Sequence, residues 1–111
     1  KFAIDNYIAQ GKIKLLPMAD CRGSEITDNE ILWITEAENT SADLMKICLS
    51  RVSSQAKVII EGDYDQIDSV AFERNNGMLR AIEVFSGDEM FGYVQLQNVW
   101  RSHIAELADK L

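Results

Sequence analysis

Two short, largely apolar runs decide how this chain folds: ILWI at residues 31–34 and KVII at residues 57–60. Each run ends directly at polar side chains, TEAEN at residues 35–39 and EGDYDQID at residues 61–68. Continuous apolar runs are typical of strands buried on both faces of a parallel sheet. Apolar residues at helical spacing lie between the two runs, within residues 44–52. The sequence therefore predicts a strand, a crossover helix and a second, parallel strand.

Further elements are predicted on both sides of this unit. Apolar spacing predicts helices within residues 4–8, 78–85 and 104–111, and short strands at residues 13–16 and 93–96. Strands that alternate with helices indicate right-handed crossovers. We therefore expect an α/β fold, with a mostly parallel sheet flanked by helices.

Composition indicates a single domain or one piece of a domain across residues 1–111. The chain is 47% hydrophobic and 26% charged, and no apolar run approaches the roughly 18 residues of a membrane helix. We expect no membrane partner and a cytoplasmic location. The first residue is Lys1 rather than methionine, which suggests a fragment or a processed chain.

The charge and cysteine content of the chain limit the nucleic-acid and metal partners that it can bind. The net charge is −7 and there is no run of lysine or arginine, so this segment lacks the clustered cations that bind nucleic-acid phosphates. Cys21 and Cys48 have neither a Cys-x-x-Cys spacing nor histidine companions. We therefore expect reduced thiols and no metal site.

Ligands in parallel sheets bind beyond the carboxyl ends of the strands, which directs attention first to residues 35–39. Glu36 at the tip of a buried strand can orient a water molecule. The alternative is that Glu36 caps the following helix, where negative charge is favourable. Thr40 and Asp43 also have the spacing of a capping box.

The second strand end carries Gly62, Asp63 and Gln66. Gly62 permits a tight turn or the close approach of a ligand to the backbone. An amide such as Gln66 can hold a nucleophilic water and contact a phosphate oxygen. The alternatives are an exposed acidic turn and a magnesium site built from Glu61, Asp63 and Asp65, as in a phosphodiesterase.

The third strand end carries Arg101 and Ser102. The five donors of a guanidinium can bind a triphosphate, whereas a surface arginine paired with an acid contributes little. We expect Ser102 to cap the last helix rather than to act as a nucleophile. His103 is adjacent to it in sequence, and helical neighbours do not face each other.

The order of these motifs resembles the PhoH family of P-loop ATPases, particularly the branch fused to PIN domains. The resemblance runs from about residue 13 to residue 111. The family's Asp-Glu-Ala-Gln-Asn resembles residues 35–39, and its Gly-Asp-x-x-Gln-Ile-Asp matches residues 62–68 at every specified position. Its Ser-Asn-Gly resembles residues 75–77, and its ending resembles residues 100–108. The resemblance implies the carboxyl-terminal half of a three-layer P-loop NTPase domain.

What the family implies can be assigned to single residues. Glu36 would be the Walker B glutamate that polarises the attacking water, and Gln66 would sense the γ-phosphate. Arg101 would neutralise charge on that phosphate, within a subunit or across a subunit boundary. Thr35, Gly62 and Asp63 would line the nucleotide site. The full-length protein would use ATP and Mg²⁺ and act on RNA or another nucleic acid, and a homo-oligomeric ring is compatible with the family.

The chain departs from the family at three points. Thr35 replaces the Walker B aspartate, and Glu38 replaces a glutamine. The Gly-x-x-x-x-Gly-Lys-Ser/Thr loop does not occur in the chain, and in the family it lies upstream. We therefore expect an upstream half as partner and no tightly bound cofactor in this fragment. A degenerate, non-hydrolysing binding or assembly module is the alternative to an ATPase.

Overall fold

The computed structural model describes residues 2–66, 74–98 and 100–111. Its elements follow the order α1 (Phe2–Ala9), η1 (Met18–Gly23), β1 (Ile31–Ile34), η2 (Ala37–Asn39), α2 (Ala42–Leu49), β2 (Lys57–Ile60), η3 (Tyr64–Gln66), α4 (Gly77–Phe85) and α5 (His103–Ala108), where η denotes a 3-10 helix. Within the described ranges, no helix combines the length and apolar character that a membrane crossing requires.

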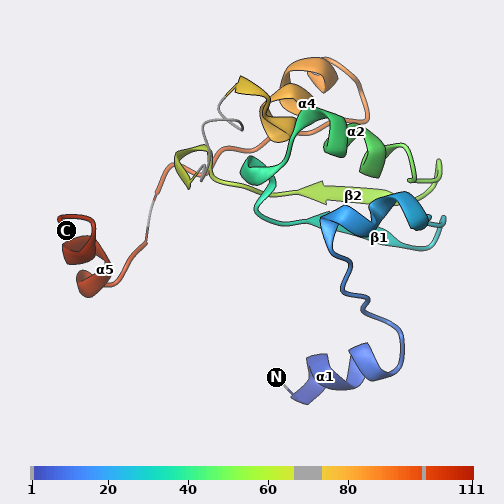
Figure 1. The fold of residues 1–111 in the computed structure, drawn as a ribbon, viewed down its shortest axis with the longest axis horizontal. Coiled ribbons are helices and arrows are strands. Elements are labelled where there is room, and N and C mark those ends of the chain that lie inside the picture. Colours follow the sequence, from blue (N-terminus) through green and yellow to red (C-terminus); the bar gives the residue numbers. More distant parts are fainter. Residues whose placement is uncertain (1, 67–73, 99) are drawn as a thin grey trace.

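The two predicted strands form a parallel pair, and both have the predicted bounds. Ile31 pairs with Lys57, and Trp33 pairs with Ile59, in a two-stranded sheet. α2 connects the strands and, with α4, lies over one face of the sheet (Figure 1). The α/β class with a parallel sheet and flanking helices is confirmed.

The core lies between this face of the sheet and the two helices. Its buried members come from the end of β1, the following turn, α2 and α4: Ile34, Ala37, Met45, Met78 and Ala81. Alternate strand residues point into it, since side chains of a strand alternate between the two faces. The buried positions of the helices include Met45 and Cys48 in α2 and Met78 and Ala81 in α4.

The opposite face of the sheet is exposed. Ile31 and Trp33 on β1 and Ile59 on β2 are 62%, 61% and 45% exposed. α1 and α5 each lie apart from the sheet and its two covering helices (Figure 1). The described residues thus form a core with helices on one side of the sheet.

The predicted strands at residues 13–16 and 93–96 are wrong, because neither segment forms a strand in the structure. Leu15 is 79% exposed, and Val94 and Leu96 are 82% and 86% exposed. A strand is stable only when its backbone pairs with a neighbour and its side chains are covered. Apolar composition alone does not create that neighbour.

Both cysteines are free, as expected, and the structure buries both. The Cys48 sulfur lies 3.6 Å from the sulfur of Met18, which links η1 to α2. Burial, together with the adjacent Cys21 thiol, raises the pKa of Cys48 to about 12. A thiol that stays protonated is a poor nucleophile, so Cys48 serves packing.

Candidate functional site

Backbone hydrogen bonds join the segments that follow β1 and β2. The amide of Glu61 donates to the carbonyl of Ile34 at 2.9 Å, and the amide of Ala37 donates to the carbonyl of Glu61 at 3.0 Å. The ladder between the strands therefore continues past their carboxyl ends. It places the segment containing Glu36 beside the segment that begins at Gly62.

Glu36 has a left-handed backbone conformation, with φ 51° and ψ 40°. It is the one non-glycine residue with positive φ among those described. This conformation costs an L-residue about 1–2 kcal/mol, and such residues concentrate at functional sites. The side chain is exposed and makes no capping hydrogen bond to η2. Glu36 therefore occupies the N-cap position of η2, where negative charge is favourable, but its side chain makes no capping hydrogen bond.

α2 is capped by Ser41 instead. The Ser41 hydroxyl oxygen accepts from the Leu44 amide at 3.1 Å, one residue after the predicted cap. The predicted capping box of Thr40 and Asp43 is therefore wrong, because Leu44 cannot bond back to the cap. Thr40 is buried, and its carbonyl accepts from the Gly77 amide at 2.6 Å. Ser and Thr have similar capping preferences, so sequence alone could not choose between these neighbours.

Gly62 allows a close approach, but the neighbour is the protein itself. A Cβ at this position would lie 2.6 Å from the Met78 sulfur and 2.8 Å from the Glu38 carboxylate oxygen Oε2. It would also lie 3.0 Å from the Glu38 amide nitrogen. Gly62 thus lets the second strand end pack directly against the turn that follows the first.

Asp63 and Gln66 form a small turn of their own. The Asp63 carboxylate accepts from the Asp65 amide at 3.0 Å and from the Gln66 side chain at 2.9 Å. All three residues are exposed. The side-chain amide of Gln66, in η3 after the end of β2, is thus held by Asp63. The rest of the predicted motif, Ile67 and Asp68, lies outside the described residues.

Asn75 and Asn76 connect the site to the helices, and the sequence interpretation gave them no role of this kind. The Asn75 side chain accepts from the Ala42 amide at the start of α2. Asn76 caps α4 by accepting from the Leu79 amide at 3.0 Å, and its side-chain nitrogen donates to the Glu38 carbonyl at 2.6 Å. Asparagine directly before an apolar helix is a local signal that could have indicated the cap. No local sequence pattern indicated the hydrogen bond from Asn76 to Glu38.

Replacing Asn76 with alanine is expected to lower the free energy of unfolding by about 2–3 kcal/mol, because a helix cap and a buried hydrogen bond are lost together. Asn76→Asp keeps the cap acceptor but cannot donate to Glu38, so it should also destabilise. Ser102→Ala is the matched control, since Ser102 caps the exposed helix α5 and should cost about 1 kcal/mol or less. Urea unfolding measures all three, and equal losses for Asn76→Ala and Ser102→Ala would contradict the double role.

Arg101 is not brought to the strand ends. It forms an ion pair with Asp109, in the arm that carries α5, and α5 lies apart from the sheet (Figure 1). Ser102 accepts from the Ala105 amide at 3.3 Å, so its predicted role as a helix cap is confirmed. The site within this chain consequently consists of the two joined segments without the arginine.

The acidic residues of the second segment do not form a metal-binding cluster. Among the described residues no three His, Cys, Asp or Glu side chains are grouped in a way that could hold a metal ion. The Asp63 carboxylate is instead engaged by Asp65 and Gln66. This geometry gives no support to a phosphodiesterase site built from Glu61, Asp63 and Asp65.

Comparison with known proteins identifies the family. The model of the family described as "PhoH-like protein" matches residues 1–111, the whole chain. The chain belongs to the PhoH-like family. It is 28% identical over 108 residues to Protein PhoH2 of Mycolicibacterium smegmatis, covering 97% of this chain and 24% of the relative. It is 35% identical over 102 residues to Protein PhoH2 of Bacillus subtilis, covering 91% of this chain and 23% of that relative.

A third relative extends the match beyond the PhoH2 proteins. The chain is 36% identical over 87 residues to Protein PhoH of Escherichia coli K12, covering 77% of the chain and 23% of the relative. The PhoH-like chain thus spans about a quarter of the length of the curated relatives that it matches. No solved structure matches it.

Proposed function

We propose that this chain supplies the water-activating part of an ATP-hydrolysing site in a full-length PhoH-like protein that acts on RNA. The observation that carries the proposal is the pair of joined strand ends, where the amide of Ala37 bonds to the carbonyl of Glu61. The bond sets the exposed, strained Glu36 beside the Gly62 segment, and Glu36 is the residue that the family assigns to water activation.

The residues present fit part of a magnesium nucleotide site. When bound, Mg²⁺ would neutralise phosphate charge and leave the γ-phosphate open to attack by water. Glu36, whose carboxylate has no hydrogen-bond partner in the part of the chain that the structure describes, would accept the proton of that water. Thr35 can hydrogen-bond a metal-bound water but adds no negative charge, and Gln66 would orient the water after leaving Asp63.

The chain also needs partners. The phosphate-binding loop would come from an upstream half of the domain, since no such loop occurs in these 111 residues. Arg101 would have to exchange Asp109 for the γ-phosphate, in its own subunit or in a neighbouring one. A homo-oligomer in the cytoplasm accommodates both possibilities.

The second candidate is a nucleotide-binding module that does not hydrolyse ATP. Two observations favour it: Thr35 stands where the family has an aspartate, and the Gln66 amide is already occupied by Asp63. Both candidates predict that the full-length protein binds nucleotide. Only the first candidate predicts that the bound ATP is hydrolysed.

Arg101→Ala in the full-length protein tests the proposal. We expect ATP hydrolysis to fall by roughly 10³-fold or more, since an arginine that stabilises phosphoryl transfer contributes at this scale. The matched control is Arg80→Ala, which removes an exposed arginine paired with Glu83 and should leave turnover unchanged. Steady-state phosphate release with and without RNA measures both. Wild-type protein that binds ATP without turning it over would support the second candidate.

A further inference from the structure

Glu38 carries a buried oxygen atom without a partner. The residue is 3% exposed, and its Oε2 has no hydrogen-bond partner among the described residues. Its backbone is well held, because Asn76 donates to its carbonyl at 2.6 Å. Buried polar side-chain atoms in native proteins nearly always have a partner, and a buried charge without one is costly. We therefore expect this carboxylate to accept a hydrogen bond from a group outside the described residues.

The surroundings of Oε2 favour a side-chain donor over a hydrated metal ion. Oε2 and the Met78 sulfur both lie against Gly62, so the carboxylate sits beneath the second strand end. Mg²⁺ usually keeps several water molecules when it binds to protein, whereas Oε2 is buried among the described residues. Methionine side chains are flexible, so Met78 can yield space to an incoming N–H group.

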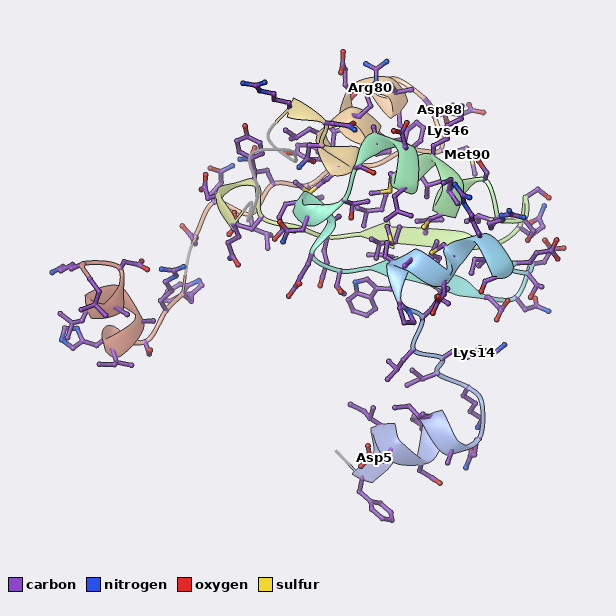
Figure 2. The ribbon with its side chains drawn as sticks, in the orientation of Figure 1. Asp5, Lys14, Lys46, Arg80, Asp88 and Met90 are labelled. Atoms are coloured by element: carbon purple, nitrogen blue, oxygen red, sulfur yellow. The ribbon has the colours of Figure 1, made fainter. Side chains whose placement is uncertain are left out.

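No basic residue near Glu38 is paired with it in the part of the chain that the structure describes. Residues 35–39 and 61–66 contain five acidic residues and no lysine, arginine or histidine, and IDSVAFE at residues 67–73 contains none either. Arg74 lies two residues before Asn76, but it is exposed, and Glu38 Oε2 has no partner among the described residues. Lys57 begins β2 and so lies at the opposite end of the strand. Figure 2 shows Lys46 and Arg80 on the helical side and Lys14 on the segment leading to α1, away from the strand ends. The local charge is strongly negative.

We propose that Glu38 is the acceptor for a lysine or arginine side chain carried by the remainder of the full-length protein. The inference rests on the proposed function, in which that remainder completes the site. The incoming cation would neutralise Glu38 and fix the turn at residues 37–39 against Gly62. Glu38 is then a positioning residue, because that turn directly follows Glu36.

Glu38→Gln in the full-length protein tests this pairing, because the amide keeps the shape and removes the charge. We expect the Tm of the full-length protein to fall by roughly 5–10 °C, as expected when one partner of a buried ion pair is removed. In the 111-residue chain the same change should raise the Tm or leave it unchanged, because there the charge has no partner. Glu36→Gln, an exposed carboxylate two residues away, is the control and should not lower the Tm of either.

A full-length Tm that is unchanged or raised by Glu38→Gln would overturn the proposal, whatever the shorter chain does. The measurement is made without nucleotide, so it does not depend on ATP hydrolysis. A protein that hydrolyses no ATP but shows the fall in Tm would refute the ATPase proposal and keep the ion pair. A protein that hydrolyses ATP but whose Tm is not lowered by Glu38→Gln would support the ATPase proposal and refute the ion pair.

Discussion

Replacing Gly77 with alanine is expected to lower the free energy of unfolding by about 2–3 kcal/mol, the scale of overpacking a close-packed contact. Gly77 begins α4, where it crosses the start of α2. A Cβ there would lie 2.6 Å from the Ser41 carbonyl oxygen and 2.8 Å from the Met45 Cβ. The Ser41 oxygen cannot easily move, because it accepts the first helical hydrogen bond of α2 from the Met45 amide at 3.0 Å.

Helix propensity acts in the opposite direction, since alanine is favoured over glycine by about 1 kcal/mol inside a helix. The sign of the measured change in stability therefore shows whether the close contact or the helix propensity dominates. Gly92→Ala is the control, because no atom of the described residues lies within 4 Å of a Cβ built at Gly92. Thermal unfolding followed by circular dichroism should give a Tm lower by about 10 °C for Gly77→Ala and little change for Gly92→Ala. A stabilised Gly77→Ala protein would show that the two helices are not packed as described.

Replacing Glu36 with glutamine is expected to reduce ATP hydrolysis by the full-length protein by roughly 10²–10⁴-fold, the usual contribution of a positioned general base. The amide cannot accept the proton of the attacking water. Because the side chain is exposed and makes no capping hydrogen bond, the fold should be unaffected. Phosphate release and the Tm, measured on the same preparation, test both statements.

Glu36→Gly separates the backbone strain from the chemistry. Glycine adopts positive φ without the penalty that Glu36 bears at φ 51°, so this variant should be more stable by up to about 1 kcal/mol. It should nevertheless lose hydrolysis as fully as Glu36→Gln does. A Glu36→Gly protein that retained turnover would assign the water-activating role to another residue.

The central strand–helix–strand unit was predictable because its signals are local. The runs at residues 31–34 and 57–60 gave both strands with their bounds, and helical spacing gave α2 and α4. The run at residues 93–96 looked the same in sequence but does not form a strand. The difference is tertiary: a strand needs a paired edge, and its sequence does not show whether one is present.

The candidate site was predictable only to the level of the sheet edge. Strand order placed Glu36 and Gly62 at one edge, as parallel topology requires. It could not show that Glu38, two residues further on, turns inward and is buried while Glu36 stays exposed. That outcome depends on the left-handed backbone at Glu36 and on the bond from Asn76, which is 38 residues away in sequence. The order of the motifs predicted Arg101 at a strand end near the phosphates, but in the structure it forms an ion pair with Asp109.

The most direct test of the account compares ATP hydrolysis by the full-length protein with hydrolysis by the 111-residue chain, at saturating Mg²⁺ and with RNA present. We expect turnover in the full-length protein and none in the chain, because in the proposed site the chain would supply the water-activating residues without a phosphate-binding loop. Hydrolysis by the isolated chain, or a folded full-length protein that neither binds nor hydrolyses ATP, would contradict it.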